Sequence, residues 1–238
     1  MSAKAFGLGS GATNLYAINQ SLRFRSSASA CLYRTFSTAQ TNATLQTVSF
    51  WVKRGALGSQ QLLFTGFSGS GFSTDLQFDA ADTLSFEIGS ASYLTTTQVF
   101  RDPSAWYHIV LKIDTGQATA ANRAILWVNG VQVSSFSATN YPALNANSSF
   151  GINTANNNIA SNNGGTNYFF DGYLTEFYFL DGTALTASSF GAFDSNGVWQ
   201  PISYSGGNYG NNGFYLNFGN ETSTTTIGYD YSGKGNNW

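Results

Sequence analysis

Short apolar segments recur about every ten residues along this chain, and this spacing constrains its fold more than any other feature. The segments are separated by Gly, Asn, Ser and Thr, and several of them alternate strictly between apolar and polar residues. In residues 48–53, for example, Val48, Phe50 and Val52 fall on one face. Alternation of this kind is typical of an antiparallel sheet with one face on a core and the other in water. Because no long stretch has helical periodicity, the pattern predicts an all-β fold, an antiparallel two-sheet β-sandwich.

A chain of 238 residues can form one large β domain. Its composition nevertheless divides it into three parts. Residues 1–18 are small and Gly-rich, and we interpret them as a flexible or docking N-terminal arm. Residues 19–195 carry the strand pattern of the sandwich. Residues 196–238 are an Asn/Gly-rich C-terminal extension with one predicted added strand, at 213–218.

Charged residues make up only 9% of the chain, against roughly 25% in an average globular protein. No basic patch or stripe of the kind found in nucleic-acid-binding proteins is present. No segment approaches the roughly 18 apolar residues of a membrane span, and the N-terminus has no signal-peptide pattern. Cys31 is the single cysteine, so an intrachain disulfide is excluded. We therefore expect no nucleic-acid partner and no membrane insertion, and synthesis in a reducing cytoplasm.

The charges are unevenly distributed along the chain. No Asp or Glu precedes Asp75, whereas six basic residues do. One interpretation is a basic face that docks on an acidic partner through Lys4, Arg23, Arg25 and Arg34. The alternative is that these are solvent-facing strand residues that protect sheet edges.

Three segments, in this order, resemble the laminin-G-like jelly-roll family of the concanavalin A-like group. They are Trp106-Tyr-His-Ile-Val110, Leu126-Trp-Val-Asn-Gly130, and Gly172-Tyr-Leu-Thr-Glu176 followed by Ala184-Leu-Thr-Ala-Ser188. The resemblance covers about residues 20–193 and implies a jelly-roll sandwich. It also implies calcium as a possible cofactor at the rim, since hard cations take oxygen ligands. Candidate ligands are Asp114, Asp171 and Asp181, although no Asp-x-Asp loop is present.

The two ends of the chain are similar to structural proteins of tailed, especially marine, bacteriophages. The similarity is carried by residues 19–24, 193–201, 213–218 and 230–238. It implies a protein of the virion surface, assembled in the host cytoplasm, such as a capsid decoration protein or a tail-fibre or adhesin module. The implied partners are other capsid or tail proteins and further copies of the chain in a homo-oligomer.

Catalysis has little support in the sequence. Glycoside hydrolases share the sandwich architecture and need two carboxyl groups about 5–9.5 Å apart. Asp75 and Asp79 share a strand face but lie about 13 Å apart along it. His108 is the single histidine, and Glu176 is expected to be structural, accepting backbone hydrogen bonds. We therefore predict no catalytic residues and no enzymatic activity, with a carbohydrate-active enzyme as the second alternative.

Glycan binding is the first alternative, because aromatic side chains stack on sugar faces while amides bond the hydroxyls. The candidate contacts lie in or beside Asn/Gly-rich loops and are Tyr141, Tyr168, Trp199, Tyr204 and Tyr209. The main prediction is thus a non-enzymatic virion surface protein that acts by docking to other proteins and by attaching to host-surface glycans. The alternative is a glycan-binding, lectin-like module.

Overall fold

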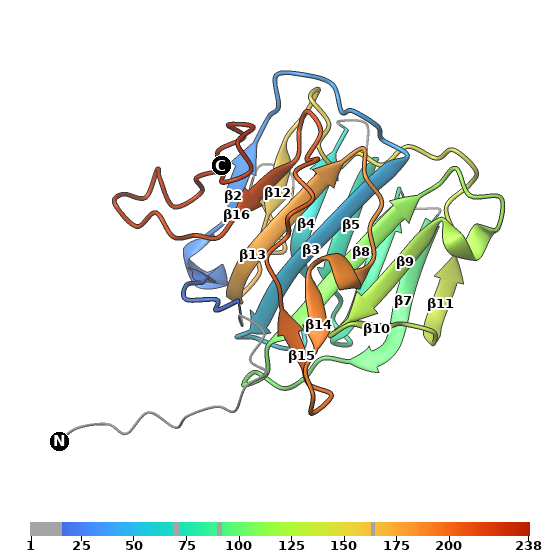
Figure 1. The fold of residues 1–238 in the computed structure, drawn as a ribbon, viewed down its shortest axis with the longest axis horizontal. Coiled ribbons are helices and arrows are strands. Elements are labelled where there is room, and N and C mark those ends of the chain that lie inside the picture. Colours follow the sequence, from blue (N-terminus) through green and yellow to red (C-terminus); the bar gives the residue numbers. More distant parts are fainter. Residues whose placement is uncertain (1–15, 69–71, 90–91, 163–164) are drawn as a thin grey trace.

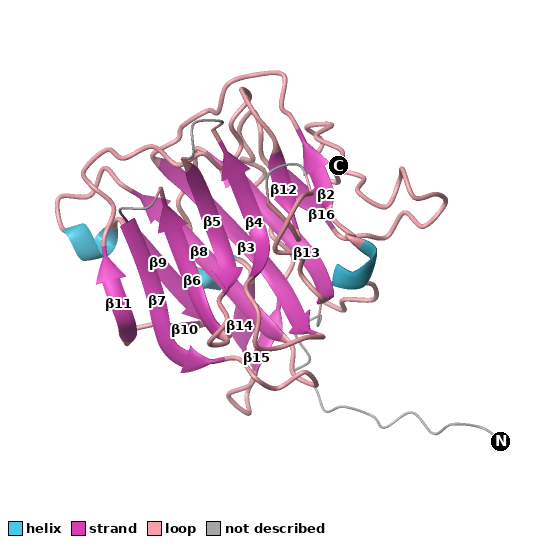
Figure 2. Ribbon diagram, turned by 180° about the vertical axis from the view of Figure 1, so that it is seen from behind, coloured by secondary structure: helices cyan, strands magenta, loops and turns pink. Residues whose placement is uncertain are grey.

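The computed structural model describes residues 16–68, 72–89, 92–162 and 165–238. Two antiparallel seven-stranded sheets pack face to face, which confirms the predicted all-β sandwich (Figures 1 and 2). The front sheet is nearest the viewer in Figure 1. Its strand order is β1 (Leu22–Phe24), β13 (Gly172–Asp181), β3 (Leu45–Arg54), β8 (Tyr107–Asp114), β9 (Ala124–Val128), β10 (Val131–Gln132). A seventh strand, β16 (Phe214–Leu216), also pairs with β13.

The back sheet faces the viewer in Figure 2. Its order is β11 (Phe136–Asn140), β7 (Ser92–Val99), β6 (Thr83–Ile88), β5 (Ser73–Phe78), β4 (Gln61–Phe67), β12 (Asn157–Ile159), β2 (Leu32–Arg34). A separate two-stranded hairpin consists of β14 (Gly191–Phe193) and β15 (Trp199–Pro201), and the single 3-10 turns are η1 (Ser26–Ala28), η2 (Ala120–Asn122) and η3 (Ala187–Ser189). Among the described residues, no helix is long and apolar enough to cross a membrane.

The alternation in the sequence matches the two faces of each strand. Val48, Phe50 and Val52 of β3 are fully buried between the sheets, and Trp51 of the same strand points to the opposite side. The centre of the core is aromatic. Phe64 of β4 stacks on Phe150 with ring centroids 4.4 Å apart. Burial of these rings is the main contribution to the stability of the sandwich.

A second apolar cluster covers part of the outer face of the front sheet. Tyr178 and Leu180 of β13 are buried there against Phe190 and Tyr209, which come from the segment after β13. The C-terminal part of the chain therefore covers one region of the sheet and leaves another open. Residues 196–238, predicted to add one strand, contain two, β15 in the hairpin and β16 beside β13.

The last residues of the chain reach the main core. The Trp238 ring lies 4.8 Å from that of Phe214 and packs at the edge of the cluster between the sheets. Residues 1–15 of the predicted N-terminal arm lie outside the described residues.

Candidate functional site

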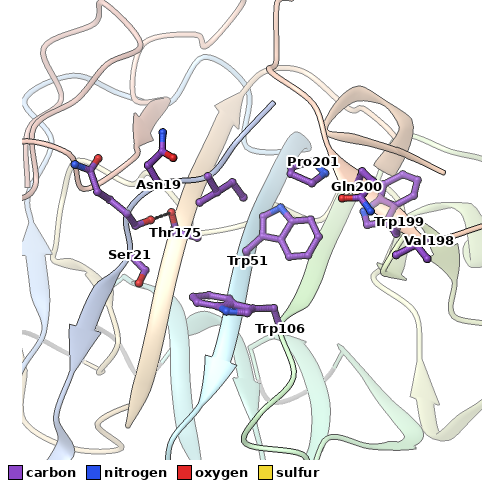
Figure 3. Close-up of a pocket in the computed structure, with 11 residues that line it drawn as sticks. Asn19, Ser21, Trp51, Trp106, Thr175, Val198, Trp199, Gln200 and Pro201 are labelled. Atoms are coloured by element: carbon purple, nitrogen blue, oxygen red, sulfur yellow. Dashed lines mark hydrogen bonds between the residues drawn. The ribbon is translucent and has the colours of Figure 1, made fainter. Parts of the chain in front are cut away.

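A groove of about 410 Å³ opens on the outer face of the front sheet, beside the β14–β15 hairpin (Figure 3). Trp51, Trp106 and Trp199 all line it, and we call it the tryptophan groove. Residues 18–21 and Thr175 form one wall, and residues 198–201 form the other. Strand β3, the segment just before β8 and the hairpin thus bring together three indole rings that lie far apart in the sequence.

Trp51 and Trp199 are held by a buried histidine between them. The His108 ring stacks on Trp51 with centroids 4.9 Å apart and on Trp199 with centroids 5.9 Å apart. The Trp199 Nε1–H donates to His108 Nδ1 over 2.9 Å. Because indole is only a donor, Nδ1 is the acceptor, and Nε2–H donates to Ser49 Oγ at 3.0 Å.

Burial lowers the pKa of His108 to about 3, so the imidazole stays neutral at physiological pH. Without a charge or access to solvent, His108 has no role as an acid or base in this groove. It stacks on both Trp51 and Trp199 and accepts a hydrogen bond from Trp199, so it orients these two rings.

Trp199 reaches His108 because two glycines leave room for its ring. A Cβ atom on Gly130 would lie 2.2 Å from Trp199, and one on Gly191 would lie 2.3 Å from it. Gly130 also has φ +77° in the turn between β9 and β10, after Asn129 at φ +47°. Glycine adopts this conformation without strain, so both the hairpin turn and the position of the Trp199 ring depend on Gly130.

The groove is apolar at its floor and polar at its edge. Trp106 is 36% exposed, and its ring lies 6.4 Å from Tyr173, over which the Arg23 guanidinium sits at 5.1 Å. Asn19, Gln20 and Ser21 are exposed on the wall opposite the hairpin. A hydrogen bond of 2.6 Å from Thr175 Oγ1 to the Gln20 carbonyl fixes this wall to β13. Aromatic faces beside amides and hydroxyls suit a ligand with both apolar and hydroxyl-bearing surfaces.

Only Trp199 of the five predicted glycan contacts lies in this groove. Tyr204 and Tyr209 belong to the second apolar cluster, where their rings lie 5.6 Å apart, and Tyr141 packs against the main core. Tyr168 is 47% exposed on the other side of the molecule, at a cavity of the back sheet. Trp51 and Trp106 were missed, although the alternation in residues 48–53 already puts Trp51 on the face opposite the core.

The three candidate calcium ligands do not come together. Asp114 and Asp181 pair with Leu45 and Gln46, on either side of β3, which puts their strands about 10 Å apart. Asp171 precedes Gly172, which pairs with Arg54 at the far end of β3. Asp181 accepts backbone N–H bonds from Thr41 at 2.7 Å, Asn42 at 3.2 Å and Asn212 at 3.1 Å. Among the described residues, no three His, Cys, Asp or Glu side chains form a metal-binding group. Calcium binding stays a prediction.

Two of the predicted docking arginines make contacts within the chain. Arg23 pairs with Asp171 at 2.7 Å, and Arg34 Nη2 donates to Asn236 Oδ1 at 2.9 Å. Arg25 is exposed, and Lys4 lies outside the described residues. The docking surface predicted from these residues therefore has one exposed arginine in the described part of the chain.

Glu176 lies at an irregularity of β13, where the register with β3 shifts between Thr175 and Tyr178. Its φ of +50° turns the carboxylate toward tyrosine hydroxyls, not toward the backbone N–H groups that we expected. It accepts from Tyr16 at 2.8 Å, Tyr178 at 2.9 Å and Tyr215 at 2.8 Å. Burial raises the pKa of Glu176, which these hydroxyls partly counteract. The carboxylate ties the segment before β1 to β13 and β16.

The fold and this groove define a β-sandwich with an aromatic groove on the outer face of one sheet. Residues 27–189 match the Laminin_G_3 family, described as the concanavalin A-like lectin/glucanases superfamily. The match covers more than half of the chain, and the chain belongs to this family. No curated protein sequence matches this chain.

Solved structures of similar fold are distant from this chain. A heptameric SAP-like pentraxin from Limulus polyphemus is 16% identical, with a TM-score of 0.45 over 72% of this chain and 76% of that one. A putative carbohydrate binding protein from Bacteroides ovatus is 15% identical, with a TM-score of 0.47 over 71% of this chain and 44% of that one. The CBM40 of the Ruminococcus gnavus IT-sialidase, bound to α2,3 sialyllactose, is 14% identical, with a TM-score of 0.44 over 66% of this chain and 94% of that one. At these identities and TM-scores, none of them bears on what this chain binds.

Proposed function

We propose that the protein is a non-catalytic carbohydrate-binding module that holds a glycan in the tryptophan groove. The observation that carries this proposal is the convergence of Trp51, Trp106 and Trp199 on one open groove. Indole faces pack against the apolar C–H faces of sugar rings, and the exposed Asn19, Gln20 and Ser21 can bond hydroxyls. The neutral His108 behind the rings supports binding and leaves no acid or base in the groove.

Replacing Trp106 with alanine is expected to weaken glycan binding at least about tenfold, since aromatic anchors dominate the energetics of such contacts. The probe is an array of neutral and sialylated oligosaccharides, read with and without calcium, followed by calorimetry with the strongest oligosaccharide. Trp106 is 36% exposed, so its truncation leaves the core intact.

The matched control is Tyr33→Ala, which removes a 62% exposed aromatic ring from β2 of the back sheet. This variant should bind as the unchanged protein does. A flat array in both buffers, or equal affinity of Trp106→Ala and the unchanged protein, would contradict the proposal.

We further propose that this module lies on the surface of a bacteriophage particle assembled in the host cytoplasm, with other virion proteins as partners and in a homo-oligomer. Support comes from the phage-like sequences at both ends of the chain. Exposed Arg25 and the N-terminal arm would contribute to docking.

Deleting residues 1–15 tests the arm, because this deletion keeps Tyr16 and its bond to Glu176. We expect the truncated protein to fold and bind glycans normally but to be lost from purified particles. Unchanged incorporation into particles, measured by quantitative mass spectrometry, would rule out anchoring by the arm and leave the glycan proposal standing.

A further inference from the structure

A cavity of about 210 Å³ on the outer face of the back sheet has no place in the function proposed above. Asp75 of β5 and Glu87 of β6 line it and are direct cross-strand partners. Residues so paired have Cβ atoms about 4.5–5.5 Å apart and side chains on the same face. The carboxyl groups that seemed too distant along one strand thus find a neighbour on the next. We call this the acidic cavity.

The acidic cavity contains no counter-charge. Among the described residues, ion pairs join Arg23 to Asp171 and both Arg54 and Arg101 to Asp82, and none reaches Asp75 or Glu87. Burial raises the pKa of Asp75, and burial followed by the charge of Asp75 raises the pKa of Glu87. Two adjacent acids without a cation attract a positive charge from solution.

Buried polar atoms with incomplete hydrogen bonding also lie beside this cavity. Thr65 of β4 is 1% exposed and is the direct cross-strand partner of Asp75. Thr65 Oγ1 and Asp75 Oδ1 have no hydrogen bond of full geometry among the described residues, although Thr65 lowers the pKa of Asp75. Asp75 Oδ2 accepts from Ser73 Oγ at 2.5 Å. The Asp75 carboxylate therefore keeps acceptor capacity for a further donor.

The remaining walls favour an organic cation over a metal ion. Calcium and magnesium need six or more oxygen ligands around them, but Leu62, Phe67 and Tyr168 form part of this cavity, and among the described residues no His or Cys that would suit zinc lines it. Its volume corresponds to about seven water molecules, enough for a six-membered ring with its substituents. The 47% exposed ring of Tyr168 offers a stacking face at the rim.

We propose that the acidic cavity binds the protonated amino group of a hexosamine. The ammonium lies between Asp75 and Glu87 and donates to their carboxylates, while the sugar ring packs on Tyr168. Gln77 Nε2 donates to Glu87 Oε1 at 3.1 Å and Gln60 Nε2 donates to Gln77 Oε1 at 2.7 Å, which holds the Glu87 carboxylate in place. This site is on the sheet opposite the tryptophan groove, and its binding is separable from binding there.

Calorimetry of the full chain with glucosamine and N-acetylglucosamine at neutral pH tests this assignment. The acetyl group removes the positive charge and keeps the ring, so glucosamine should bind at least about tenfold more tightly. Asp75→Asn and Glu87→Gln should each abolish that preference. Glu221→Gln removes the same charge from an exposed position in the loop after β16 and should keep it. Trp106→Ala should keep it as well, which separates this site from the tryptophan groove.

Three results would overturn the proposal. The first is equal affinity for glucosamine and N-acetylglucosamine. The second is a glucosamine preference that survives in both acid variants while their thermal unfolding shows a native fold. The third is displacement of glucosamine by calcium chloride, or cleavage of glucosaminides that Asp75→Asn abolishes, since either would assign the acids to a metal or to catalysis.

Discussion

Replacing Asp82 with asparagine is expected to destabilise the protein by about 3–5 kcal/mol, because it leaves a buried guanidinium without its counter-charge. Arg54 is 1% exposed, and its Nη1 lies 3.0 Å from Asp82 Oδ1. Its Nε and Nη2 are buried without hydrogen-bond partners in the described structure, and the group lies over the Phe78 ring. The positive charge therefore depends on Asp82, and asparagine tolerates the φ of +64° at that position.

Arg101→Gln is the matched control, since it removes the other arginine of Asp82. Arg101 Nε is 2.9 Å from Asp82 Oδ2, but its side chain is 59% exposed. Loss of an exposed partner should reduce stability by less than about 1 kcal/mol. Urea unfolding of both variants measures the difference. Similar losses for Asp82→Asn and Arg101→Gln would contradict the assigned role of Asp82.

The same carboxylate predicts a pH dependence. Burial alone would raise the pKa of Asp82, but the Gly58 N–H, Arg101 and Arg54 together hold it below its ordinary value. A depressed pKa in the folded state means that the stabilisation is complete above the unfolded value, about 3.9, and is lost as the pH falls below it. The stability difference between the unchanged protein and Asp82→Asn should therefore shrink below about pH 4.

Replacing Phe64 with alanine is expected to destabilise the protein by about 3–5 kcal/mol, since it leaves a cavity at the centre of the aromatic core. Phe64 is fully buried and contacts five other rings. These rings come from the front sheet, from the loop before β12 and from the C-terminal residue Trp238, whose centroid is 6.2 Å away. The loss should therefore also loosen the C-terminal segment, which hydrogen exchange of residues 228–238 would detect.

Phe64→Leu should lose less than half as much stability as Phe64→Ala, because leucine fills most of the volume although it lacks the ring contacts. Denaturant unfolding with an unchanged m-value would show that both variants unfold from the same folded state. A loss below about 1 kcal/mol for Phe64→Ala would mean that the core collapses into the space.

Much of the architecture could be predicted from local pattern. Strict alternation in β3 assigned Val48, Phe50 and Val52 to the core, and the structure buries all three. The Asn129–Gly130 pair is typical of a tight hairpin turn, and both residues have positive φ in the turn between β9 and β10. These features depend on neighbours in sequence, so a single chain reveals them.

The candidate sites were harder to predict because they depend on contacts between distant segments. Trp199 was selected from composition, but its place beside Trp51 depends on the space above Gly130 and Gly191. Asp79, the acid nearest to Asp75 along the chain, is too far away to pair with it, whereas Glu87 lies beside Asp75 only because of the register of β5 and β6. Tyr204 and Tyr209 lie in a loop as expected, but the loop folds back so that their rings cover the front sheet.

The sequence by itself determined that this chain forms an antiparallel β-sandwich, because side-chain alternation and turn conformations are local. Only the tertiary structure decided which polar and aromatic side chains meet on the outer faces. Strand register and the path of the C-terminal segment bring together residues that have no relationship along the chain. A groove with three tryptophans and a cavity with two acids that have no ion-pair partner among the described residues are products of that packing.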